Sequence, residues 1–177
     1  MTQTRKYQLE IFEEAKQRNV IAFLPTGSGK TQIALELIKH FVDDKSQKKL
    51  KIFFLVPTVP LVAQQALQIR RFVRVKVIES SGNKPVKAKD LESNKSKCVF
   101  VTTPALLREW LQHAFVNMKE IALIVFDECH HTSGDHEYNK IMREYYFQVP
   151  QNHRPRILGL TASPGILDGM CNVCYCV

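Results

Sequence analysis

Several features that would assign a chain to a special class of protein are missing from these 177 residues. The longest aliphatic and aromatic runs, residues 52–56 and 121–126, are far shorter than the roughly 20 residues needed to cross a bilayer. Residues 1–8 are polar and charged, without the apolar stretch of a secretory signal. No repeat or low-complexity tract is present. These absences favour a folded domain with no membrane partner that acts inside the cell, in the cytoplasm or the nucleus.

Acidic residues are outnumbered by basic ones. The 17 Asp and Glu residues face 25 Lys and Arg residues, which gives a net charge of +8 and a pI near 9.3. This balance favours a polyanionic partner such as nucleic acid, although solubility alone also explains a basic surface. Hydrophobic residues make up 45% of the chain, which excludes the depleted composition of a disordered protein.

The five cysteines lack the spacing of a zinc site. Cys98 and Cys129 lie beside apolar, strand-like runs and are predicted to be structural. Cys171, Cys174 and Cys176 cluster near the end of the sequence, but no second ligand group with zinc spacing follows them. We therefore expect reduced thiols, and the cluster is more typical of a frayed tail than of a metal site.

Helix-like and strand-like patterns alternate along the chain. Apolar residues have helical spacing in residues 5–18, 30–42, 61–71, 105–113 and 136–147. Short apolar runs predict strands at residues 20–24, 52–56, 73–78, 99–102, 121–126 and 156–160. This alternation predicts an α/β fold, in which a mostly parallel sheet has helices on both faces.

A glycine-rich turn between the first strand and the next helix predicts a phosphate-binding loop. Its residues are Leu24, Pro25, Thr26, Gly27, Ser28, Gly29, Lys30 and Thr31. The two glycines let backbone N–H groups turn toward phosphate oxygens, and the following helix adds its positive end. Lys30 is then expected to meet the β- and γ-phosphates, and Thr31 to bind magnesium. The alternative is a turn that binds no nucleotide.

Two adjacent carboxylates follow the apolar run at residues 121–126, at the edge where open parallel sheets bind ligands. Asp127 suits a magnesium contact, directly or through water, and Glu128 suits the orientation and deprotonation of an attacking water. An isolated Asp-Glu pair is more often a solvated turn, but the earlier phosphate loop favours a shared site. His130 is expected to make hydrogen bonds rather than bind metal, and so to link this site to a later tripeptide. That tripeptide is Thr161, Ala162 and Ser163.

Six short motifs occur in the order found in superfamily 2 helicases and cover nearly the whole chain. Tyr7-Gln8 resembles the adenine-reading Q motif, residues 24–31 motif I, residues 57–65 motif Ia, residues 102–104 motif Ib, residues 127–130 motif II, and residues 161–163 motif III. The general phosphate loop has a glycine where this chain has Leu24, and the superfamily commonly lacks that glycine. The difference favours these helicases over GTPases and kinases of the P-loop class.

The sequence around motif II gives a narrower resemblance. Residues 127–131, Asp-Glu-Cys-His-His, and the later pattern at residues 136–143 are similar to Dicer and Dicer-like helicase domains. They are also similar to the duplex-RNA-sensing helicases of innate immunity, but residues 61–66 and 103–107 favour the Dicer-like branch. The resemblance implies a first RecA-like motor domain at residues 1–165, followed by a divergent cysteine-containing tail at residues 166–177.

The resemblance also implies an activity: an RNA-dependent ATPase that uses ATP and Mg²⁺, binds double-stranded RNA, and acts in RNA silencing or antiviral RNA recognition. Gln8 and residues 24–31 would bind the nucleotide, with Lys30, Asp127 and Glu128 as the hydrolytic set. RNA contacts would come from Pro57, Thr58, Gln64, Thr103 and Pro104. The plainer interpretation of Pro57-Thr58 and Thr103-Pro104 is that proline ends a strand.

In this family a second RecA-like domain in cis completes the ATP site and supplies arginines, which are worth on the order of a thousandfold or more in rate. That domain is absent from this sequence, so we expect the chain to bind nucleotide far better than it hydrolyses it. One alternative is a truncated, non-hydrolysing module that binds RNA or a partner protein. Another is a fragment of a DNA-repair helicase of the same superfamily, whose motif II usually reads Asp-Glu-Ala-His. No ribonuclease III, PAZ or duplex-RNA-binding domain is visible, so RNA cleavage is not predicted.

Overall fold

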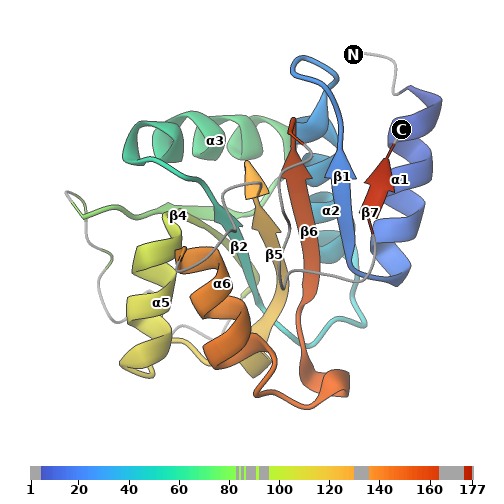
Figure 1. The fold of residues 1–177 in the computed structure, drawn as a ribbon. Coiled ribbons are helices and arrows are strands. Elements are labelled where there is room, and N and C mark those ends of the chain that lie inside the picture. The colour runs from blue at the N-terminus through green and yellow to red at the C-terminus, as the bar shows by residue number, and fades with distance from the viewer. Residues whose placement is uncertain are drawn as a thin grey trace.

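The computed structural model describes residues 5–82, 84, 86, 91, 96–129, 136–163 and 174–176. In this part of the chain a single parallel sheet lies between two sets of helices (Figure 1). The strand order is β3-β4-β2-β5-β6-β1-β7. Every neighbouring pair is parallel. The predicted α/β class, a parallel sheet with helices on both faces, is confirmed.

The strands are β1 Val20–Phe23, β2 Lys51–Leu55, β3 Lys76–Glu79, β4 Cys98–Thr102, β5 Ile121–Phe126, β6 Arg156–Thr161 and β7 Cys174–Cys176. Three of them, β2, β4 and β5, are buried along their whole length, which explains their continuous apolar runs. The third strand, β3, starts at Lys76 rather than at the predicted residue 73. The Val73 N–H still donates to the Ile69 carbonyl and so caps the preceding helix. Within the predicted tail, β7 pairs with β1, and the rest lies outside the described residues.

The helices are α1 Lys6–Gln17, α2 Lys30–Asp43, α3 Val59–Phe72, α5 Pro104–Gln112 and α6 Glu137–Ile141, with shorter turns at η1 Met118–Glu120, η3 Met142–Tyr146 and η4 Gln151–His153. One core cluster joins α1, α2 and α3 to one face of the sheet, and a second joins α5 and α6 to the other. The single helix predicted at residues 136–147 is instead α6 followed by the π-helical turn η3. No helix in the described ranges is long and apolar enough to span a bilayer.

Cys98 and Cys129 are buried thiols outside any disulfide, which confirms the predicted structural role.

A lysine side chain supports the end of α2. Lys97 reaches across to the end of α2 and donates to the carbonyls of Phe41 and Val42, each at 2.9 Å, and to that of Asp44. The last carbonyls of a helix have no partner within it, so this ammonium satisfies them and opposes the negative helix end.

Lys97→Met keeps the aliphatic chain and removes these three bonds. Because the carbonyls lose a charged donor, we expect the free energy of unfolding to fall by about 1–2 kcal/mol, measured by urea denaturation. The matched control is Lys119→Met at an exposed position of η1, which should change stability by less than about 0.5 kcal/mol. Equal losses in the two variants would contradict the capping role.

Candidate functional site

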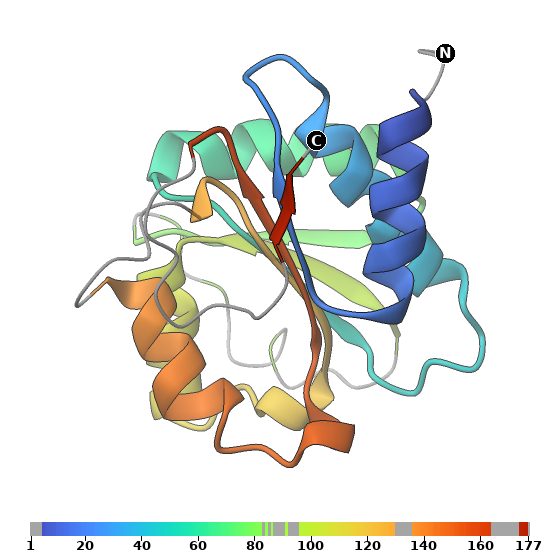
Figure 2. The same ribbon diagram turned by 45° about the vertical axis from the view of Figure 1, so that its right-hand side comes forward.

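The loop after β1 stands above the sheet edge at which β5 and β6 end, and it leads directly into α2 (Figure 2). Gly27 and Gly29 have φ values of 77° and 86°, in the left-handed region that favours glycine. A β-carbon on Gly29 would clash with Gln8 Nε2, so a larger residue would displace that side chain. The first turn of α2 holds no acidic residue, which leaves its positive end available to an anion.

Lys30 and Leu24 close this loop on itself. The Lys30 ammonium donates to the Leu24 carbonyl at 3.0 Å, and the Leu24 N–H donates to the Thr161 carbonyl at 3.0 Å. The Leu24 side chain is buried in the core, so at the position of the missing glycine this chain has a packing residue. Pro25, Thr26 and Gly27 are exposed, whereas Thr31 is half-buried at the start of α2.

Tyr7 and Gln8 hold the loop from α1. Both donate to the Ser28 carbonyl, the Tyr7 hydroxyl at 2.6 Å and Gln8 Nε2 at 3.0 Å. Gln8 Nε2 also lies 3.4 Å from the Gly29 carbonyl, and Gln8 Oε1 accepts from the Arg5 N–H at 2.9 Å. The amide assigned to adenine recognition is therefore bonded to the phosphate loop itself.

A cavity of about 350 Å³ opens between α1 and this loop. Arg5 and Tyr7 line it together with residues 24–28, and its volume lies in the range of small-molecule sites. Nothing in the sequence pattern pointed to Arg5, which precedes α1 and comes near the loop only through folding. The Ser28 hydroxyl is buried here, and the described residues give it no hydrogen-bond partner.

The acidic pair occupies the end of β5. The Asp127 N–H continues the sheet by donating to the Leu55 carbonyl at 2.9 Å, and the Glu128 N–H turns back to Asp127 Oδ1 at 3.1 Å. Glu128 has a φ of 49°, a conformation that non-glycine residues seldom adopt. Such backbone strain is concentrated at functional sites, where the surroundings hold it in place.

The two halves of the site interact electrostatically. Burial raises the pKa of Asp127, and the charge on Glu128 raises it further, to about 6. The Glu128 N–H and the ammonium of Lys30 act in the opposite direction and lower this pKa. The structure thus brings Lys30 of the loop and Asp127 of β5 within electrostatic range of each other, as the shared sheet edge led us to expect.

Of the five residues expected to contact RNA, four follow the carboxyl ends of β2 and β4, and Gln64 lies on α3. Thr58 and Thr103 are the N-cap residues of α3 and α5, and neither hydroxyl is used as a cap. Both helices lack acidic residues in the first turn, so the positive end of each helix lies beside a threonine hydroxyl that makes no capping hydrogen bond. Gln64 is exposed, whereas Pro57 is half-buried and Pro104 is buried, so Pro104 acts in packing.

The tripeptide at residues 161–163 forms a closed turn. The Thr161 hydroxyl donates to the Ser163 carbonyl at 2.9 Å and accepts from the Ser163 N–H at 3.1 Å. Ala162 is half-buried between them. Through its own carbonyl Thr161 also holds Leu24, which connects this turn to the phosphate loop by backbone. His130, expected to complete the link, lies outside the described residues.

These groups fit a magnesium–nucleotide complex. The Asp127 carboxylate and the Thr31 hydroxyl are hard oxygen ligands of the kind that Mg²⁺ prefers, and the loop offers backbone N–H groups and Lys30 to phosphates. In the described part of the chain no three His, Cys, Asp or Glu side chains form a metal-binding group. Magnesium commonly keeps waters and substrate phosphates as ligands, so two protein oxygens suffice.

The raised pKa of Asp127 has a consequence for stability. Its folded value of about 6 exceeds the ordinary 3.8, so the fold favours the protonated form and loses stability as pH rises from 3.8 to 6. Asp127→Asn removes this penalty, and at pH 7.5 we expect it to raise the free energy of unfolding by about 1–3 kcal/mol. The gain should disappear below about pH 4 in urea denaturation followed across pH.

The matched control for this experiment is Asp43→Asn, which changes an exposed carboxylate on α2. It should give no gain of similar size. If Asp127→Asn destabilised the chain at pH 7.5, burial would not be the dominant effect on the Asp127 carboxylate.

The sequence is similar to known helicase-type proteins along most of its length. Residues 1–166 match the family described as "Type III restriction enzyme, res subunit". Over 90% of its length the chain is 44% identical to "Dicer-like protein 1" of Aspergillus terreus. Over 98% it is 41% identical to "Endoribonuclease Dicer homolog 1" of Arabidopsis thaliana. The matches cover 11% and 9% of these relatives, so the chain spans about a tenth of their length.

A solved structure shows the same fold. The crystal structure of the Pyrococcus furiosus Hef helicase domain has a TM-score of 0.75 and 32% identity, and the match covers 92% of this chain and 34% of that one. It confirms the predicted RecA-like fold, and the Dicer-like relatives confirm the predicted branch. The chain therefore belongs to the type III restriction enzyme res subunit family, as a RecA-like, ATP-binding helicase domain of the Dicer-like branch.

Proposed function

We propose that this domain binds ATP and Mg²⁺ between the phosphate loop and the acidic pair, as the motor half of a duplex-RNA-dependent ATPase. The observation that carries the proposal is that Lys30 lies within electrostatic range of Asp127, where its charge lowers the pKa of that carboxyl. A cation and a carboxylate within electrostatic range at a sheet edge, beside a glycine-rich helix start, are suited to a magnesium–phosphate complex. No other cluster of the described residues combines these features.

Each residue of the site has a distinct part in this proposal. The loop at residues 24–31 binds the phosphates through backbone N–H groups, and Lys30 neutralises their charge. Thr31 and Asp127 would hold magnesium, which supplies positive charge to the transferring phosphoryl group when bound. Glu128 orients the attacking water and accepts its proton. A second RecA-like domain in cis would supply the arginines, so we expect slow hydrolysis by this chain alone.

The RNA contacts would lie along the same sheet edge. We infer that Thr58 and Thr103 hold phosphates or 2′-hydroxyls of one strand with the first N–H groups of α3 and α5, and that Gln64 adds a polar contact. Such contacts position RNA without reading its sequence. The turn at residues 161–163, together with His130, would couple this surface to the nucleotide. The names of the Dicer-type relatives support a role in RNA silencing or antiviral RNA recognition inside the cell.

Lys30→Ala tests the nucleotide site directly. It removes the ammonium that meets the phosphates, so we expect Mg²⁺-dependent ATP affinity to fall by at least about tenfold in titration calorimetry. Lys39→Ala, an exposed position on the same helix, is the control and should bind as the wild type does. Equal binding by the wild type and Lys30→Ala would refute the proposed site. Tight binding with no turnover, even with a second motor domain present, would favour the non-hydrolysing alternative.

Thr58→Val and Thr103→Val test the RNA surface. Each change keeps the shape of the side chain and removes one hydroxyl, so we expect duplex-RNA affinity to fall by about three- to tenfold, measured by fluorescence anisotropy. Gln112→Ala, at the far end of α5, should leave this affinity unchanged. Equal affinity for duplex DNA and duplex RNA would favour the DNA-repair alternative, because the 2′-hydroxyl is the chemical difference between them.

A further inference from the structure

Residues 136–143 have no part in the proposed function, yet they make a buried contact with the site. Tyr138 is fully buried, and its hydroxyl donates to the main-chain carbonyl of Asp127 at 2.8 Å. Its ring packs edge-on against Phe126, the last residue of β5, with ring centroids 4.9 Å apart. Tyr138 therefore contacts the strand end that carries both carboxylates.

The bond from Tyr138 acts on the peptide group that joins Asp127 to Glu128. The N–H of this peptide donates to Asp127 Oδ1, and its carbonyl accepts from Tyr138, so both of its polar groups are bonded. Because the peptide is planar, rotating it would change the ψ of Asp127 and the φ of Glu128 together. Rotation would therefore break the bond that holds the Asp127 carboxylate and change the backbone conformation at Glu128. The left-handed φ of Glu128 shows that this plane is held in an unfavourable orientation.

Packing alone does not account for the hydroxyl of Tyr138. A phenylalanine would fill the same space against Phe126, whereas a buried phenol needs a hydrogen-bond partner. Asp127 follows the last residue of β5, so its main-chain carbonyl lies beyond the regular hydrogen bonds of the sheet and needs another donor. The hydroxyl and the Asp127 carbonyl thus satisfy each other at the point where the strand becomes the site.

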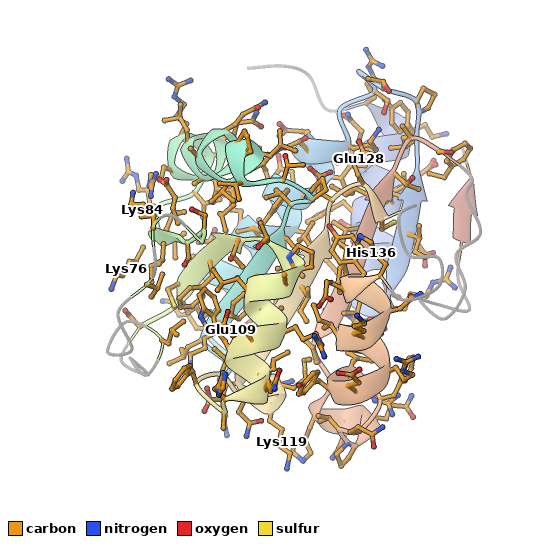
Figure 3. The ribbon with its side chains drawn as sticks, turned by 60° about the vertical axis from the view of Figure 1, so that its left-hand side comes forward. Lys76, Lys84, Glu109, Lys119, Glu128 and His136 are labelled. Atoms are coloured by element: carbon orange, nitrogen blue, oxygen red, sulfur yellow. The ribbon has the colours of Figure 1, made fainter. Side chains whose placement is uncertain are left out.

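Tyr138 is itself held firmly by its neighbours. His136 Nδ1 accepts from the Tyr138 N–H at 3.3 Å as the cap of α6, and the two rings lie edge-on with centroids 4.9 Å apart. Arg108 of α5 pairs with Glu137 at 3.5 Å and with Glu144 at 3.3 Å. Figure 3 shows Glu128 at the sheet edge and His136 below it, at the start of α6. Tyr138 is therefore a fixed support, docked through α6 onto α5.

We propose that Tyr138 is a positioning residue of the nucleotide site: its hydrogen bond fixes the peptide that directs Asp127 toward magnesium and Glu128 toward the attacking water. The role rests on the proposed function, since it belongs to the same site. Partners that orient metal-binding groups in this way typically contribute about 10–100-fold to metal affinity or activity.

Two tyrosine variants of the full 177-residue chain test this role. Tyr138→Phe removes the bond to Asp127. The control, Tyr146→Phe, removes the hydroxyl of another buried tyrosine near the opposite edge of the sheet, where the Asn19 amide donates to it at 2.7 Å. Both tyrosines are buried, so similar losses of thermal stability are expected. ATP affinity is then measured by calorimetry with saturating Mg²⁺ and with EDTA, below both melting temperatures.

The decisive quantity is the ratio of ATP affinity with Mg²⁺ to that with EDTA. We expect it to fall about tenfold in Tyr138→Phe and to stay unchanged in Tyr146→Phe. His136→Ala, which loosens the start of α6 and keeps every tyrosine hydroxyl, should lower it about threefold. If Tyr138→Phe does not fold, the affinity ratio of His136→Ala tests the role of Tyr138 instead.

An unchanged ratio in folded Tyr138→Phe, or in His136→Ala where Tyr138→Phe does not fold, would overturn the role of Tyr138. An equal fall in Tyr146→Phe would also overturn it, because the effect would then follow from lost stability. Wild-type chain without Mg²⁺-dependent binding would refute the proposed function, and the role of Tyr138 with it. The Lys30→Ala comparison separates these failures, since its loss of binding supports the nucleotide site whatever Tyr138 does.

Discussion

Asp127 lies where a fully buried strand, β5, reaches the sheet edge, so its carboxylate loses much of the water that would stabilise its charge. Burial and the charge of Glu128 raise its pKa to about 6, while Lys30 opposes them only in part. A carboxylate held in this way gains from a further cation, which is the property that a magnesium site requires. The phosphate loop and α2 place Lys30 within electrostatic range of the Asp127 carboxylate.

Helices from opposite faces of the sheet support the two halves of the site. From one face, α1 donates two hydrogen bonds to the Ser28 carbonyl through Tyr7 and Gln8. From the other face, α6 donates one to the Asp127 carbonyl through Tyr138. In both cases a side chain bonds to a main-chain carbonyl that precedes a residue with a left-handed φ, Gly29 in the loop and Glu128 after β5. The core on each face therefore contributes to the geometry of the site as well as to stability.

The order and type of the elements could be predicted, because buried parallel strands have continuous apolar runs and their helices have a clear period. The proximity of Lys30 to Asp127 was also predictable, since the carboxyl ends of parallel strands lie at one edge of the sheet. The contacts of Gln8 with Ser28 and of Tyr138 with Asp127 were not, because they depend on how helices dock after the sheet has formed. The late start of β3 and the π-helical turn η3 likewise arise from local packing that no spacing rule encodes.

In the proposed mechanism, Glu128 at the end of β5 provides the carboxylate that activates water. Its most direct test is Glu128→Gln in a chain extended through the second motor domain, with ATP turnover measured at saturating duplex RNA. We expect turnover to fall by about 10²–10⁴-fold while nucleotide affinity changes by less than about twofold. Unchanged turnover, or a loss of nucleotide binding in proportion to the loss of turnover, would contradict this role of Glu128.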